Sequence, residues 1–169
     1  SARLAASPAS EVVDPRDAVR PAGRARRPAR HLPARHWRLS AFVPVYDPPP
    51  WGAHANFLLT FIGFLCLGIF LFRGSLRQRL RFPMGLAVIF WASGHLLANG
   101  DRASLILFGG FLLYAILHIV TATGQGVRPS PDVRAGHDLL SLLVGTALYG
   151  VMTQLHPVLI GVPILVLTR

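Results

Sequence analysis

The sequence predicts an all-α protein, a polytopic transmembrane helix bundle of about four spans with a disordered N-terminal tail. Hydrophobic residues make up 52% of the 169 residues, and the mean hydropathy is +0.47, well above that of a soluble domain of this size. The apolar residues also gather into long runs that are separated by short polar segments. We therefore expect the lipid bilayer to be the main partner of this chain.

Residues 1–36 are predicted to form a disordered tail that is rich in arginine, alanine and proline. Nine of the 17 arginines lie in the first 38 residues, and no window there has an apolar period long enough to bury a core. The net charge of +10 would suit a nucleic-acid partner, but most of the other arginines flank the apolar runs. The arginines therefore resemble topology signals, and no nucleic acid is expected.

Residues 37–169 are predicted to form the transmembrane domain. The three prolines of Asp47–Trp51 cannot enter a helix interior and mark its first boundary. At about 1.5 Å per residue, the first apolar run just reaches across a hydrocarbon layer of about 30 Å, and the later runs are also plausible spans. Pro157, Gly161 and Pro163 interrupt the last run, so the C-terminal segment is expected to lie at the interface or to re-enter the membrane. The predicted spans are 56–72, 82–99, 103–122 and 139–155.

The loops between the spans predict their orientation. Arg73–Arg81 contains four arginines in nine residues, whereas the second and third spans are joined by the short Asn99–Arg102 segment. The positive-inside rule places Arg73–Arg81 in the cytoplasm and Asp101 on the outer side. Arg128 and Arg134 in the next loop agree with this orientation. The same count places the arginine-rich tail outside, which is an exception to the rule.

Histidines are the remaining material for chemistry, because the sequence has no Gly-rich phosphate loop, nucleophile elbow or His-Glu-x-x-His motif. From the helix rise, His54, His95 and His156 fall near the outer face, and His118 and His137 near the inner one. Three imidazoles from three helices form a candidate haem b or transition-metal site. Alternatively, they hydrogen-bond headgroups or helix ends. His95 is the strongest candidate because it lies farthest into the apolar layer.

The polar residues between the second and third spans predict a sharp hairpin. Asn99 and Gly100 accept the left-handed backbone that ends a helix, and Asp101 adds an outer charge at the turn. In the third span, Gly109 and Gly110 are expected to let another helix approach closely, with a binding cleft as the alternative.

The stretch GHLLANGDRASLILFGGF, Gly94–Phe111, resembles the NnrU family of bacterial integral membrane proteins. In that family a helix ending in His-Leu-x-x-Asn-Gly-Asp runs into Ser-x-x-Leu-Phe-Gly, and the resemblance extends over residues 37–169. It implies a bacterial cytoplasmic (inner) membrane protein with an accessory role in denitrification and nitric oxide metabolism. The motif residues that it carries over are Asn99, Gly100, Asp101, Ser104, Phe108, Gly109 and Gly110.

The resemblance also implies an alternative function. The family is related to the plant 15-cis-zeta-carotene isomerase, so a haem-dependent cis–trans isomerase acting on a carotenoid is a second hypothesis. This chain has Phe82 where relatives read histidine, the residue implicated in haem ligation in the isomerase. Relatives also begin with apolar helices, whereas this chain begins with its basic tail. A small non-catalytic helical subunit of a larger respiratory or photosynthetic complex is the third hypothesis.

Overall fold

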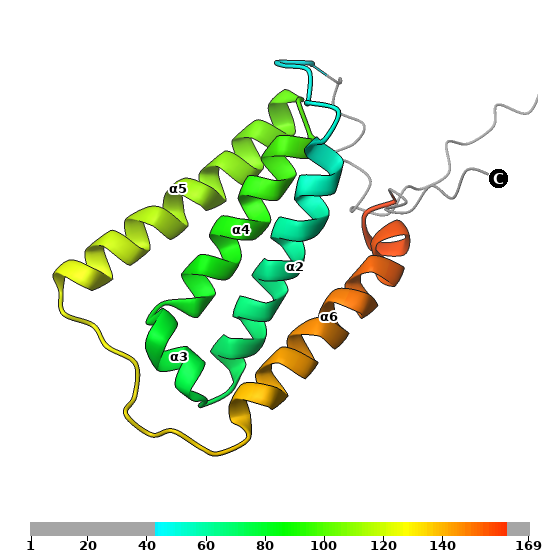
Figure 1. The fold of residues 1–169 in the computed structure, drawn as a ribbon. Coiled ribbons are helices and arrows are strands. Elements are labelled where there is room, and N and C mark those ends of the chain that lie inside the picture. Colours follow the sequence, from blue (N-terminus) through cyan, green and yellow to red (C-terminus); the bar gives the residue numbers. More distant parts are fainter. Residues whose placement is uncertain (1–42, 162–169) are drawn as a thin grey trace, which may run out of the picture. The chain divides into compact units, whose positions relative to one another are not determined.

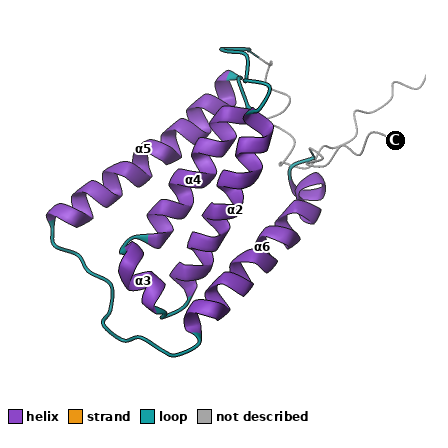
Figure 2. Ribbon diagram, in the orientation of Figure 1, coloured by secondary structure: helices purple, strands orange, loops and turns teal. Residues whose placement is uncertain are grey.

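The computed structural model describes residues 43–161, and the regular structure in that range is helical apart from one isolated β-bridge. The predicted all-α class is confirmed (Figures 1 and 2). The predicted tail, 1–36, and the end of the predicted C-terminal segment, 162–169, lie outside the described residues. The helices in the described range are α2 (Gly52–Leu71), α3 (Ser75–Leu80), α4 (Pro83–Ala98), α5 (Arg102–Gly124) and α6 (His137–Leu159).

Three of the described helices, α2, α5 and α6, are long and apolar enough to cross a membrane. The fourth apolar helix, α4, has 16 residues and is shorter than a full span. At 1.5 Å per residue it is about 24 Å long, against a hydrocarbon layer of about 30 Å. The sequence predicted four spans, and the structure has three helices of spanning length and one shorter apolar helix. The chain is an integral membrane protein.

The outer faces of α5 and α6 are consistent with a lipid environment. Large apolar side chains on both helices are exposed, and Ile106 of α5 is 69% accessible. A soluble chain would expose far less contiguous apolar surface. Lipid tails solvate such side chains, so these faces need no protein cover within a bilayer.

Local residues explain where three of the helices begin. Pro83 opens α4, and proline suits a first helical position because its missing N–H would have no helical partner there. Asp101 precedes α5 and accepts a hydrogen bond from the Ser104 N–H at 3.0 Å. Gly136 precedes α6 with a φ of +77°, a backbone that glycine adopts without strain.

Two segments differ from the sequence expectation. The arginine-rich linker contains the short helix α3, because the Asp138 carboxylate of α6 accepts hydrogen bonds from the Ser75 hydroxyl and the Leu76 N–H. Helix α6 runs to Leu159 and includes Pro157, where the predicted span ended at residue 155. Because this proline lies in the last turn, few helical hydrogen bonds depend on it.

The helices pack in the order α5–α4–α2–α6, since α2 contacts both α4 and α6, and α4 contacts α5 (Figure 1). Glycines allow these close contacts. A Cβ at Gly63 of α2 would lie 3.0 Å from the Ala87 carbonyl oxygen of α4. A Cβ at Gly145 of α6 would lie 2.6 Å from the Phe64 carbonyl oxygen of α2. Membrane helices use small residues in this way because tight packing, not exclusion from water, drives their association.

We expect Gly145→Ala to lower the melting temperature of the detergent-solubilised protein, whereas Gly150→Ala in the same helix should not. The methyl group at 145 would meet α2 backbone, and overpacking costs about 1–3 kcal/mol. At Gly150 a Cβ has no neighbour within 4 Å among the described residues. Scanning fluorimetry of both variants measures the difference. Equal melting temperatures would contradict the close α2–α6 contact.

Candidate functional site

The turn that joins α4 to α5 is hydrogen-bonded to the segment that precedes α2. The Gly100 carbonyl oxygen accepts from the N–H groups of Val45 at 2.8 Å and Tyr46 at 3.2 Å. The Arg102 N–H donates to the Val43 carbonyl oxygen at 2.9 Å. The Tyr46 hydroxyl donates to the carbonyl oxygen of Asn99 at 2.9 Å. The motif therefore holds together two parts of the chain that are distant in sequence.

The prediction of a left-handed backbone at this turn is wrong. Asn99 is extended, with φ −129° and ψ 117°, and Gly100 is not among the described glycines with positive φ. Glycine is needed at position 100 for space, because a Cβ there would overlap the carbonyl oxygen of Tyr46. The Asn99 side chain instead satisfies the end of α4, since its Nδ2 donates to the His95 carbonyl oxygen at 2.8 Å.

Asp101 and Ser104 form the N-terminal cap of α5. The Asp101 carboxylate accepts hydrogen bonds from both the N–H and the hydroxyl of Ser104, whose side chain is buried. Burial of the Asp101 carboxyl opposes its ionisation, but the hydrogen bonds outweigh it and hold its pKa below the ordinary value. The positive end of the helix dipole also favours the carboxylate. These two motif residues therefore stabilise the start of α5.

His95 lies in the last turn of α4 and packs among aromatic rings. Its ring stacks on Phe108 of α5 with centroids 4.5 Å apart, and the Trp91 centroid lies at 5.2 Å. Its Nδ1 is 2.8 Å from the Trp91 carbonyl oxygen. Since a carbonyl oxygen only accepts, Nδ1 carries the hydrogen, and Nε2 keeps the lone pair in the neutral ring. A metal-ligating histidine uses this same tautomer.

The other two predicted ligands differ in their relation to His95. His156, near the end of α6, lies within electrostatic range of the His95 imidazole. His54 lies exposed on the first turn of α2. Within residues 43–161, no three histidine, cysteine, aspartate or glutamate side chains are grouped to hold a metal ion. A ligand role for these imidazoles stays a prediction.

The Phe108–Phe111 stretch contributes its aromatic residues to the α4–α5 contact. Phe108 is buried, with its ring 5.1 Å from that of Trp91, and the Phe111 ring lies 5.6 Å from Trp91. A Cβ at Gly109 or Gly110 would meet nothing within 4 Å in the described part of the chain. The predicted close approach of another helix at this glycine pair is therefore not made among these residues.

The apolar cavity beside Trp91 does not fit a haem. An apolar cavity of about 140 Å³ lies between α2 and α4, and Trp91 lines it but His95 does not. Sites for small molecules have volumes of about 300–1,000 Å³, so a porphyrin is too large for this cavity. Phe82 lies at the other end of α4, with the Arg81 guanidinium 5.0 Å from its ring centroid. His95 and Phe82 are thus at opposite ends of one helix.

A second cavity, of about 270 Å³, lies at the arginine-rich end of the helices. Side chains from α2, α3, α4, α5 and the α5–α6 loop line it, among them Arg77, Arg81, Arg128 and His118. Sequence reasoning missed this site because it interpreted the arginines as topology signals alone. Phe82 also lines this cavity.

Comparison with known proteins agrees with the motif. A family model described as NnrU protein matches residues 32–164, which include every described helix. No curated protein and no solved structure matches the chain.

Asp101→Ala should destabilise the protein by about 1 kcal/mol at neutral pH, because α5 loses its cap. A depressed pKa in the folded state stabilises the fold only while the carboxylate is ionised. The deficit should therefore be complete above about pH 4, the ordinary carboxyl pKa, and should fade as the pH falls further. Unfolding in detergent between pH 7 and pH 3 measures it. Asp47→Ala, at an exposed position, is the control; a deficit that does not change with pH would contradict the cap.

Proposed function

The chain belongs to the NnrU protein family, and we propose that it has an accessory role in denitrification and nitric oxide metabolism in the bacterial cytoplasmic membrane. The match over residues 32–164 carries this proposal, because it covers most of the chain and all of the motif. In this proposal the protein works as a helical membrane subunit that supports a larger respiratory complex.

The hydrogen bonds of the motif residues favour this subunit role. The polar groups of Asn99, Asp101 and Ser104 make hydrogen bonds within the α4–α5 turn. The turn is bonded in addition to Val43–Tyr46, so it is a rigid junction between two segments. Rigid elements present a binding surface at low entropic cost. A structural role therefore explains the motif without any reacting group.

The outer face of α5 provides a place for a partner helix. Gly109 and Gly110 have open space beside them among the described residues, and Ile106, Leu113 and Leu117 on the same helix are exposed. Small residues allow a membrane helix to approach closely, as the contacts of α2 with α4 and α6 illustrate. This favours another membrane protein as the partner.

Haem binding with isomerase activity is the second candidate, and the His95 tautomer is the observation that favours it. The small apolar cavity and the position of Phe82 count against it. Residues that ligate haem must lie on a cavity wide enough for the macrocycle, and His95 is instead packed on Phe108. We therefore favour the accessory role.

Deletion of the coding sequence should impair anaerobic growth on nitrate but leave aerobic growth close to that of the parent strain. Nitrite or nitric oxide should accumulate during anaerobic growth, and a wild-type copy should restore the parent behaviour. Time courses of growth and of both nitrogen oxides measure this. Identical nitrogen-oxide time courses in the deletion and parent strains would rule out the denitrification role.

A Gly109→Leu/Gly110→Leu copy should reach the membrane at normal levels and fail to restore growth of the deletion strain on nitrate. The two leucines fill open space, so the chain itself should tolerate them, whereas a partner helix should not. Gly124→Leu, also on α5 and also without a close neighbour, is the matched control and should restore growth. Restoration by the double variant would exclude this face as the partner surface.

The protein purified from a haem-sufficient host should show no Soret band in oxidised or reduced spectra. The reason is the packing of His95 and the small size of the neighbouring cavity. Optical spectra with metal analysis test this. A Soret band that His95→Ala abolishes would replace the subunit proposal by the haem hypothesis.

A further inference from the structure

The cavity at the arginine-rich end is built from several elements of the fold. Arg77 belongs to α3, Arg81 to the two-residue link between α3 and α4, and Arg128 to the α5–α6 loop. Its volume is about 270 Å³. Three arginines from separate segments thus line one cavity, which a simple run of basic residues would not produce.

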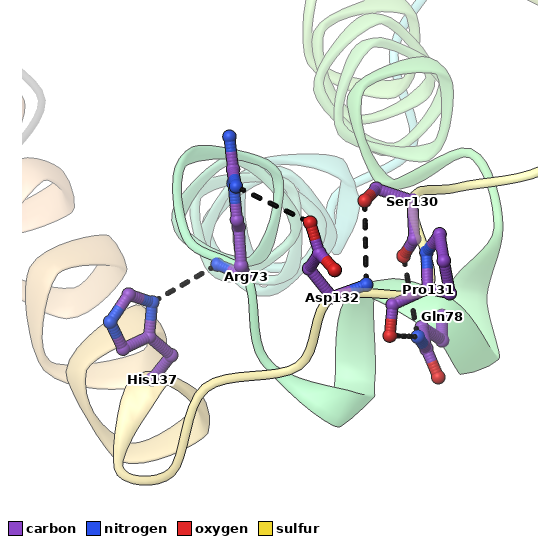
Figure 3. A network of polar contacts seen from close by, with 6 residues as sticks. All are labelled: Arg73, Gln78, Ser130, Pro131, Asp132 and His137. Carbon is purple, nitrogen blue, oxygen red and sulfur yellow. Dashed lines mark hydrogen bonds and ion pairs between the residues drawn. The ribbon is translucent and has the colours of Figure 1, made fainter.

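The loop that carries Arg128 is fixed on both sides of this residue. Before it, the Val127 carbonyl oxygen accepts a hydrogen bond from Nε of Arg81 at 2.9 Å. After it, the Ser130 and Pro131 carbonyl oxygens accept from Nε2 of Gln78 at 3.3 and 2.9 Å (Figure 3). These bonds hold the loop backbone on both sides of Arg128 against α3 and Arg81.

The same loop is also anchored beyond the cavity. Figure 3 shows Asp132 facing Arg73, with the charged groups 3.8 Å apart, and the Arg73 N–H donating to Nδ1 of His137 at 3.1 Å. Arg73 and Asp132 form the one ion pair found among the described residues, and neither of them lines the cavity. The loop therefore has its own neutralising contact, separate from the cavity arginines.

Aromatic rings orient two of the cavity arginines. The Arg77 guanidinium lies 5.3 Å from the Phe70 ring centroid, and that of Arg81 lies 5.0 Å from the Phe82 ring centroid. Stacking on a ring uses the face of the guanidinium and leaves N–H groups at its edge for an anion. Phe70 and Phe82 also line the cavity, so cationic and apolar surfaces occur side by side.

The start of α4 adds backbone donors to these charges. Helix α4 has no side-chain cap, and its second and third residues, Met84 and Gly85, line the cavity. Backbone N–H groups in a first helical turn have no helical acceptor, and the helix dipole favours an anion there. No aspartate or glutamate of the described residues lines the cavity, so no carboxylate competes for this position.

From this arrangement we propose that the cavity binds the phosphate group of an anionic phospholipid. The guanidinium groups and the uncapped helix start match phosphate oxygens, and the phenylalanines match the glycerol ester and acyl carbons. The ends of membrane-spanning helices lie near the lipid headgroups, so the bilayer itself provides the phosphate group. Phe82 is then part of a lipid site, which gives the position a role other than metal ligation.

Native mass spectrometry of the full chain, released from detergent and titrated with phosphatidylglycerol or phosphatidylcholine, tests the proposal. Phosphatidylglycerol should bind at least about tenfold more tightly, and Arg77→Gln/Arg128→Gln should weaken it by about tenfold per arginine. Arg79→Gln/Arg134→Gln removes the same charge from the same two segments, but neither residue lines the cavity. This control should keep the wild-type affinity.

Equal loss of affinity in the two double variants would overturn the proposal, because only the general positive charge would then matter. Displacement of phosphatidylglycerol by inorganic phosphate at equal concentration would overturn the lipid assignment and leave a site for the free anion. Retention of the lipid in excess phosphate supports the assignment. If the first double variant does not fold, Arg128→Gln against Arg134→Gln makes the same comparison within one loop.

Discussion

The close approach of α4 and α6 to α2 is the constraint on which the rest of the described structure depends. Lipid tails solvate apolar side chains as well as a protein interior does, so helices in a membrane associate through tight packing. A Cβ at Gly52 would overlap the Leu97 carbonyl oxygen of α4, and one at Gly68 would overlap the Ser141 carbonyl oxygen of α6. Helix α2 therefore sets the positions of both neighbours, and α4 in turn carries α5.

The ends of the helices solve a different problem, since backbone groups there lose their helical partners at the edge of the hydrocarbon layer. At one end, Asp101 caps α5 and Gly100 accepts bonds from the segment before α2. At the other, Asp138 of α6 caps α3, and His137 accepts from the Arg73 N–H. In the described residues no buried side-chain polar atom lacks a partner. At each end of the bundle, residues from different helices therefore bond some of these backbone groups, whereas the start of α4 has no side-chain cap.

The sequence predicts what depends on composition and misses what depends on contacts between distant residues. The apolar segments follow from hydropathy, because lipid solvation is a sum over neighbouring side chains. Helix α3 depends on hydrogen bonds to Asp138, which lies far along the chain, so no local sequence pattern predicts this helix. For Gly100 the sequence predicts a left-handed backbone. The structure instead requires glycine there for space, because a Cβ would overlap the carbonyl oxygen of Tyr46, which is a tertiary contact. Small residues allow close helix packing, so the sequence predicts a helix contact at Gly109 and Gly110, but no described helix makes it.

Helix α4 has chemically opposite ends, and this contrast limits what each end can bind. At His95, Nδ1 donates to the Trp91 carbonyl oxygen of the same helix and the Phe108 ring stacks on the imidazole, so Nε2 is the ring nitrogen left for a further ligand. At Phe82 the helix starts without a cap, and arginines from two other segments surround it. An anion is stabilised at the start of a helix and a cation at its end. Phe82 therefore lies at the end of α4 that is better suited to an anion than to a metal cation.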